Sequence, residues 1–258
     1  MTAPDCPSGG VFLLDKPCGP TSFYLVRQVR RLLAIKKVGH AGTLDPFASG
    51  LLIVCAGRAA TRIIDAFMLG EKEYLATLCL GVRTATGDPE GAIIERRTVA
   101  EFDHQRLETV FDAFRGEYQQ TPPIYSALKH QGKPLYAYAR KGIAIQKPPR
   151  LVRISLLARE SLAFALDGSA SLTIRVRCGK GTYIRKLAED IGDLLGCGAY
   201  LTALRRTMIG SFRVEQAVAA DALTGDDGLG SLEKARLGEE ELAVVLPERC
   251  GPVTVAGV

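Results

Sequence analysis

The chain has 258 residues, 47% of them hydrophobic, and a formal net charge of +5. This composition supplies enough apolar side chains for a real core and excludes a disordered main body, and no apolar run is long enough to span a membrane. Residues 1–10 lack the basic segment that begins a signal peptide, and seven dispersed cysteines without a Cys-x-x-Cys pair predict reduced thiols rather than disulfides or a zinc site. Both observations indicate a cytoplasmic protein. Because no linker or repeat divides the sequence, we expect one domain over residues 1–258.

The basic residues gather in two stretches that contain no acid. Six lie between Lys16 and Leu44, and eight lie between Tyr118 and Arg159, where three tyrosines are interleaved. Residues 1–213 hold 30 basic and 19 acidic residues, a net charge of +11, whereas the tail at 214–258 holds nine acids and three bases. A merely solvated face usually mixes both signs, so this distribution favours a surface that follows RNA phosphates.

The first predicted helix begins at Thr21 or Ser22, either of which can cap it. Its expected buried stripe follows helical spacing and consists of Phe23, Val26, Val29 and Leu33. The basic side chains of this helix fall largely away from that stripe, at positions 27, 30 and 31.

The next segment, Gly39 to Gly50, is a glycine-rich loop that leads into an apolar strand starting at Leu51. Its glycines permit positive φ or the close approach of a ligand, and Pro46 favours an extended or turning conformation at Asp45. A carboxylate on such a loop suits catalysis. The commoner fate of a loop aspartate is to bond nearby backbone amides in a turn.

The rest of the chain predicts a mixture of helices and strands. Helices are expected at 58–69, at 105–114 and at 183–195, the last ending at Gly196, and strands at 74–80, near 151–157 and at 172–178. Because the order lacks regular βαβ alternation, the pattern predicts an α+β fold rather than a doubly wound sheet.

The glycine-rich loop is one of several motifs that occur in order between Leu14 and Val214. The others are Leu14-Asp15-Lys16-Pro17 with Gly19-Pro20-Thr21-Ser22, Lys72-Glu73-Tyr74, Pro122-Pro123-Ile124-Tyr125-Ser126-Ala127-Leu128-Lys129, Gly181-Thr182-Tyr183-Ile184-Arg185, Gly196-Cys197-Gly198-Ala199 and Leu204-Arg205-Arg206-Thr207. Together they resemble the TruB family of tRNA pseudouridine synthases. The resemblance implies the pseudouridine synthase fold, a mixed, mainly antiparallel sheet with flanking helices around a central catalytic cleft.

The resemblance also implies three catalytic residues. Asp45 matches the family's nucleophile, Tyr74 offers a ring to stack on uracil and a hydroxyl to manage a proton, and Arg185 supplies the charge that keeps a desolvated carboxylate ionised. Without the motifs, Tyr74 would be read as a core aromatic at a strand start. Arg185 would be read as a surface arginine beside Glu189.

Further residues follow from the same motifs. His40 matches the family histidine that packs where the extruded base leaves space, and Asp88 matches an acidic turn that orders the active-site loop. Phosphate or pocket contacts are expected from Lys16, Arg62, Tyr183 and Leu204. Residues 122–153 resemble the inserted thumb that closes on the T-arm of tRNA, with Lys129, Lys133, Arg140 and Lys141 as RNA contacts. The alternative for the thumb is an ordinary helical hairpin.

Three departures from the family pattern stand out. Ala85 replaces an aspartate in a Thr-Asp-Thr run, which puts the local hydrogen bonding in doubt, and Tyr200 replaces a frequent histidine. The residues after Ser211 are too few and too acidic for the C-terminal PUA module that bacterial members often carry. Recognition is therefore expected to rest on the T-arm and thumb.

The implied function is isomerisation of uridine 55 in the tRNA T-loop to pseudouridine, by a monomer without metal or cofactor. Three scattered histidines form no ligand cluster, and no Walker loop or Gly-x-Ser-x-Gly elbow occurs. Two alternatives stay open. One is a non-catalytic tRNA-binding or folding protein of the same fold, and the other is a related synthase that acts on rRNA or is directed by a guide RNA.

Overall fold

The computed structural model describes residues 9–245, and the chain forms two compact units. Of the described residues, 9–70 and 207–245 belong to unit 1, and Glu71–Arg206 form unit 2. No helix in the described part of the chain is long and apolar enough to cross a membrane.

Unit 1 is built on two long antiparallel strands, β1 and β3, which pair from Gly10↔Ala56 to Lys16↔Gly50. Strand β2 pairs antiparallel with β3, and the short β14 pairs parallel with β1. The strands of this unit are β1 Gly10–Lys16, β2 Val38–Ala41, β3 Ser49–Ala56, β13 Phe212–Arg213 and β14 Val218–Ala219.

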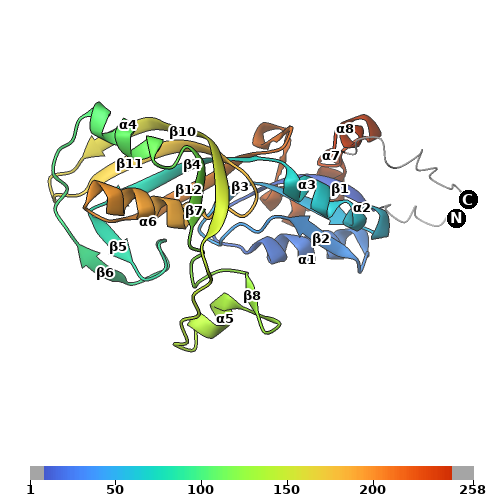
Figure 1. The fold of residues 1–258 in the computed structure, drawn as a ribbon. Helices are drawn as coiled ribbons and strands as arrows, with labels where there is room; N and C mark the ends of the chain where they lie inside the picture. Colours follow the sequence, from blue (N-terminus) through green and yellow to red (C-terminus); the bar gives the residue numbers. More distant parts are fainter. Residues whose placement is uncertain (1–8, 246–258) are drawn as a thin grey trace, which may run out of the picture. The chain divides into compact units, whose positions relative to one another are not determined.

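Helices cover both faces of this sheet (Figure 1). One core packs α1, η2 and α7 against one face, and a second core packs α2 and α3 against the other. The acidic C-terminal segment contributes Leu223 and Leu232, both fully buried, to the first core. The helices are α1 Ser22–Leu33, α2 Arg58–Arg62, α3 Ile64–Leu69, η1 Val214–Gln216, η2 Ala220–Thr224, α7 Gly228–Lys234 and α8 Glu239–Ala243.

Two expectations for unit 1 helices need correction. Helix α1 is capped by Thr21, whose Oγ1 accepts from the Tyr24 amide as predicted, but Phe23 is 52% exposed, and Leu25 is buried in its place. The helix expected at 58–69 is two helices, because Ile63, with φ −98° and ψ 4°, leaves the helical conformation between them.

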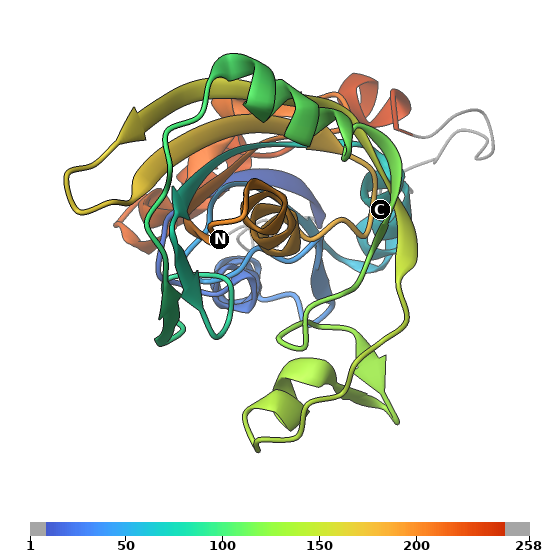
Figure 2. The ribbon, with the colours of Figure 1, turned by 60° about the vertical axis from the view of Figure 1, so that its left-hand side comes forward.

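Unit 2 is an antiparallel sheet that curves around helix α6 (Figure 2). The order is β12-β4-β11-β10-β7, and β12 belongs to this unit up to Arg206. Its strands are β4 Lys72–Leu80, β7 Gly116–Gln120, β10 Arg150–Phe164, β11 Ala170–Cys178 and β12 Ala199–Ile209, with β5 Val82–Thr84 and β6 Ile93–Arg96 as a separate hairpin. The α+β class and the mixed, mostly antiparallel sheet are confirmed.

Helices α4 His104–Asp112 and α6 Ile184–Leu195 close the core of unit 2. The expected end of α6 is confirmed, since Gly196 adopts φ 88°, a left-handed conformation that favours glycine at a helix end. Gly87, beside Glu189 of α6, adopts φ 71°, a conformation that also favours glycine.

The thumb segment projects from the end of the β7–β10 pair, at the bottom of Figures 1 and 2. It contains the two-residue strands β8 Lys129–His130 and β9 Lys133–Pro134 and the short helix α5 Leu135–Ala139. It is therefore a small hairpin plus one helix rather than a helical hairpin.

Candidate active site

Hydrogen bonds from Lys16 hold the backbone of the loop that carries Asp45. This lysine is fully buried, and its Nζ donates to the carbonyl oxygens of Pro17 (2.9 Å), Pro46 (3.2 Å) and Ala48 (2.6 Å). A buried ammonium is stable only when its charge is met by such dipoles. Lys16, expected as a phosphate or pocket contact, thus lies where it holds the Asp45 loop in shape.

The first residue of α1, Ser22, also holds this loop through hydrogen bonds. Ser22 Oγ donates to the Leu44 carbonyl (3.1 Å) and accepts from the Leu44 amide (2.9 Å). The Gly19 amide donates to the Pro46 carbonyl, and the Ala48 amide donates to the Asp45 carbonyl. Asp45 therefore sits, half-buried, in a backbone turn whose position several buried groups determine.

His40 and Arg62 both belong to unit 1, on elements that each contact β3. His40 is half-buried on β2, where it pairs with Val54 of β3, and Arg62 is exposed at the end of α2. Strand β2 lies close to α3, the helix that follows α2, since a Cβ on Gly39 would lie 2.9 Å from the Ile64 side chain.

Tyr74 belongs to unit 2 and stands third in β4, opposite Val176 of β11. It alternates with Glu73, whose side chain points to the other face and pairs with Arg175 at 3.2 Å and Arg177 at 2.7 Å. Tyr74 is half-buried, whereas Ala76, two residues further on the same face, is fully buried. The ring therefore stands at the margin of the core.

Arg185 lies in the first turn of α6 and is only 6% exposed. Its Nη1 contacts Asp88 Oδ2 at 3.2 Å and donates to the Thr86 carbonyl at 3.0 Å, and its Nη2 donates to the Tyr125 carbonyl at 2.8 Å. The surface-arginine interpretation of Arg185 is wrong, because a surface side chain would not be buried among these partners.

Asp88 orders the loop against which Arg185 rests. Its Oδ1 accepts from the Thr86 hydroxyl (2.5 Å) and the Glu90 amide (3.1 Å), while its carbonyl accepts from Thr84 Oγ1 (2.8 Å). The Ala85 amide donates to the Ala92 carbonyl. The loop therefore keeps its hydrogen bonds although position 85 is alanine. The hydroxyl groups of both neighbouring residues, Thr84 and Thr86, donate to Asp88.

Gln120 is a buried polar residue next to a motif residue, Tyr183, and nothing in the sequence pattern singled it out. It is fully buried at the end of β7, where its Oε1 accepts from the Tyr183 amide (2.8 Å) and its Nε2 donates to the Tyr183 carbonyl (3.1 Å). Tyr183 is the N-cap residue of α6, and its ring lies 5.0 Å from the Arg150 guanidinium. Gln120 therefore ties the root of the thumb to the helix that carries Arg185.

Lys72 and Leu204 complete the interior of unit 2 around the motif residues. Leu204 is 7% exposed on β12, so it packs as a core side chain. Lys72 is also 7% exposed, and burial, reinforced by the nearby charge of Arg206, lowers its pKa to about 8. Opposite it on β11, burial raises the pKa of the Cys178 thiol to about 11.

The thumb presents the four expected basic side chains to solvent. Lys129, Lys133, Arg140 and Lys141 are all exposed. The Arg140 guanidinium lies 5.5 Å from the ring of Tyr136, which is itself 43% exposed. This combination of cations with an accessible ring suits both the phosphates and the bases of RNA.

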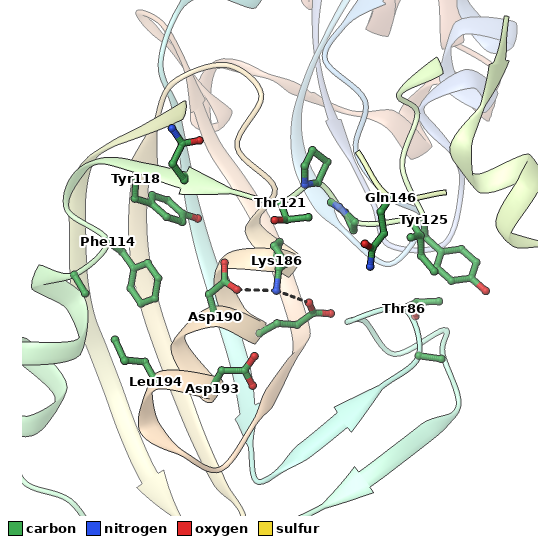
Figure 3. Close-up of a pocket in the computed structure, with 17 residues that line it drawn as sticks. Thr86, Phe114, Tyr118, Thr121, Tyr125, Gln146, Lys186, Asp190, Asp193 and Leu194 are labelled. Carbon is green, nitrogen blue, oxygen red and sulfur yellow. Dashed lines mark ion pairs between the residues drawn. The ribbon is translucent and has the colours of Figure 1, made fainter. Parts of the chain in front are cut away.

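A cavity of about 790 Å³ lies beside α6, but none of the predicted site residues lines it (Figure 3). Phe114, Tyr118 and Tyr125 form part of its wall, and Lys186 pairs with Asp190 at 2.7 Å and Glu189 at 3.4 Å. Burial raises the pKa of both Glu189 and Asp190. Since Asp193 adds a further acid, this cavity suits an RNA phosphate poorly.

Among residues 9–245, no three His, Cys, Asp or Glu side chains are placed to hold a metal ion. The free cysteines of this range include the exposed Cys18 and the buried Cys55.

Known proteins resemble this chain along most of its length. Residues 30–184 match the family model of the TruB family pseudouridylate synthase N-terminal domain, and residues 185–232 match that of the tRNA pseudouridylate synthase B C-terminal domain. A tRNA pseudouridine synthase B of Desulfotalea psychrophila is 55% identical over 237 residues, which are 92% of this chain and 94% of that protein. One of Burkholderia lata is 50% identical over 84% of this chain and 66% of its own length.

The fold is also found in solved structures. A chain in the crystal structure of a Cbf5-Nop10-Gar1 complex superimposes with a TM-score of 0.67 and 28% identity, over 95% of this chain and 68% of that one. A chain in an H/ACA RNP bound to a substrate RNA gives a TM-score of 0.64 and 27% identity, over 92% and 61%.

Proposed function

This chain belongs to the TruB family of pseudouridine synthases, and from that membership we propose that it converts uridine 55 in the T-loop of tRNA to pseudouridine. Its relatives at 50–55% identity are named tRNA pseudouridine synthase B, so the protein is a tRNA-modifying isomerase. The observation that carries the proposal is the Asp45 loop, whose backbone is held by the buried Lys16 and Ser22. We propose further that it acts in the cytoplasm as a monomer, without cofactor or obligate partner.

The reaction sets the chemical requirements of the site. The N1–C1′ bond breaks, the base turns, and C5 bonds to C1′; the C5 proton then leaves to solvent and N1 takes up a proton, so the product is an isomer of the substrate. No electron donor or acceptor takes part. In the proposed mechanism Asp45 supplies the carboxylate, either as a nucleophile at C1′ or by promoting a ribose-derived glycal, because splitting one difficult step into two lowers the barrier. A uridine inside a folded loop must first be extruded from its stack.

Tyr74 and Arg185 have separate roles in this proposal. The half-buried Tyr74 ring offers uracil a face at the margin of the unit 2 core, and its hydroxyl manages the proton at C5. Arg185 is a fixed positive charge, because Asp88 and two backbone carbonyls hold its guanidinium in one orientation. The thumb and its exposed basic residues grip the T-arm.

A non-catalytic tRNA-binding protein is the competing function. Binding alone requires neither a carboxylate on a braced loop nor a buried arginine with its own acidic partner. A guide-directed synthase is a second competitor, since the similar solved chains belong to complexes named with Nop10, Gar1 or substrate RNA. Turnover of free tRNA by the purified chain separates both from our proposal.

The test compares wild type with Asp45→Asn by tritium release from an unmodified tRNA that carries 5-³H-uridine. We expect the variant to lose on the order of 10³-fold or more in rate while tRNA affinity changes little, because Asn keeps the size of Asp and the bonds from Lys16 and Ser22 to the loop go to backbone atoms. Asp65→Asn, a change at an exposed acid of α3, is the matched control and should retain full activity. Appreciable activity of Asp45→Asn in a folded protein would remove Asp45 from the mechanism.

A further inference from the structure

An exposed aromatic side chain stands among arginines on helix α1 of unit 1. Phe23 is 52% exposed, although it occupies an apolar position of the sequence pattern. The guanidinium groups of Arg27 and Arg30 lie 5.9 and 5.4 Å from its ring centre, and Arg27 also lies 5.9 Å from the ring of Tyr24. The core of unit 1 does not use Phe23, because Leu25, Val26 and Val29 face inward instead.

The charged residues of α1 and of the turn that follows it are all basic. Arg27 and Arg31 are exposed on α1, and Lys36 and Lys37 are exposed just beyond its end. The whole stretch from Lys16 to Leu44 contains no acid that would neutralise them. Arg30 differs from its neighbours, since its Nη2 donates to the Val38 carbonyl at 3.1 Å and it helps to hold α1 on β2. We call Phe23, Arg27 and Arg31 the α1 surface.

The α1 surface begins next to the Asp45 loop. Ser22, the residue before Phe23, makes both hydrogen bonds to Leu44, and Gly19, just upstream, donates to the Pro46 carbonyl. When a nucleotide binds at Asp45, the RNA that flanks this nucleotide therefore lies within reach of the first turns of α1.

We propose that the α1 surface is a second RNA contact, separate from the thumb, at which an unpaired base stacks on Phe23 while Arg27 and Arg31 bind the flanking phosphates. Aromatic rings beside guanidinium groups, in a field of positive charge, are the chemistry that single-stranded RNA requires. A second copy of this chain fits less well, because two such basic faces would repel each other. The inference rests on the proposed function, since it takes the RNA to be the one that Asp45 acts on.

The experiment measures binding of an unmodified T-arm stem-loop RNA by fluorescence anisotropy at several salt concentrations, with tritium release measured in parallel. Phe23→Ala should weaken binding by about 5- to 160-fold, the range for one base stacked on one ring. Arg27→Ala with Arg31→Ala should reduce the slope of log K against log salt by about 1.4, at roughly 0.7 for each single-strand phosphate contact. For both variants the single-turnover rate at saturating RNA should stay near that of wild type.

Matched controls keep the test specific. Ile94→Ala removes an exposed apolar side chain of unit 2, and Arg96→Ala with Arg213→Ala removes two exposed charges on elements that do not pack against α1. Neither should alter affinity or slope as the α1 variants do. Wild-type affinity in folded Phe23→Ala and Arg27→Ala/Arg31→Ala proteins would overturn the inference. If wild type binds the RNA but releases no tritium, the proposed function fails, while the binding comparison still decides the α1 surface.

Discussion

At the scale of single residues, the buried Lys72 links the stability of the protein to pH. Its pKa is lowered from 10.5 to about 8, first by burial and then by the charge of Arg206. Between pH 8 and 10.5 the unfolded chain keeps the proton and the native protein has lost it, so the unfolded state binds more protons and stability rises with pH. From pH 7 to 10.5 this single group should add roughly 2–3 kcal/mol to the free energy of unfolding.

Lys72→Met isolates this contribution from other groups that titrate in alkali. Cys55 and Cys178 act in the opposite direction, because burial raises the pKa of both thiols and their deprotonation favours the unfolded state. We would measure the free energy of unfolding in urea for wild type and variant at pH 7 and 10.5. The contributions of the two thiols are present in both proteins, so they drop out of the difference between them. We expect the variant's stability relative to wild type to fall by roughly 2–3 kcal/mol between the two pH values. A difference that does not change with pH would mean that Lys72 keeps an ordinary pKa.

At the scale of elements, Gln120 determines how the thumb's root and helix α6 meet. Gln120→Ala leaves the amide and carbonyl of Tyr183 without these two bonds, which should cost about 1–3 kcal/mol of stability. Because Tyr183 is the N-cap residue of α6, whose first turn carries Arg185, a small shift there should lower the single-turnover rate by roughly 10- to 100-fold. RNA affinity should change much less. Gln119→Ala, at the exposed neighbouring position, is the control for both measurements, and a purely structural Gln120 would lower stability without lowering the rate.

The elements also explain which parts of the structure the sequence could predict. Local signals were sufficient where one residue dictates the backbone, as with the Thr21 cap and the left-handed Gly196. They failed where long-range contacts decide, because Phe23 fits an apolar stripe by spacing alone and Gln120 finds Tyr183 63 residues further along the chain. Asp45, Tyr74 and Arg185 came from motif resemblance, and no local pattern indicated that Asp88 and Tyr125 would hold Arg185.

At the scale of the whole molecule, the placement of charge should matter more to tRNA binding than its sum. The net charge is only +5, since acids after residue 213 offset much of the basic surface. Screening confines each exposed charge to about 8 Å at physiological salt, so a distant acid does little to a phosphate held by the thumb. Affinity should therefore depend on which basic side chains touch RNA.

Two triple variants with the same change in net charge test this expectation. Lys133→Ala, Arg140→Ala and Lys141→Ala remove thumb charges, whereas Arg96→Ala, Arg213→Ala and Lys234→Ala remove exposed charges from other elements. The thumb variant should reduce the slope of log K against log salt by about 2–3, because each lost contact to a duplex or single-strand phosphate removes roughly 0.7–0.9. The second variant should leave the slope close to that of wild type. Equal losses in both would mean that tRNA responds to overall charge, and the thumb would then have no special part in gripping the T-arm.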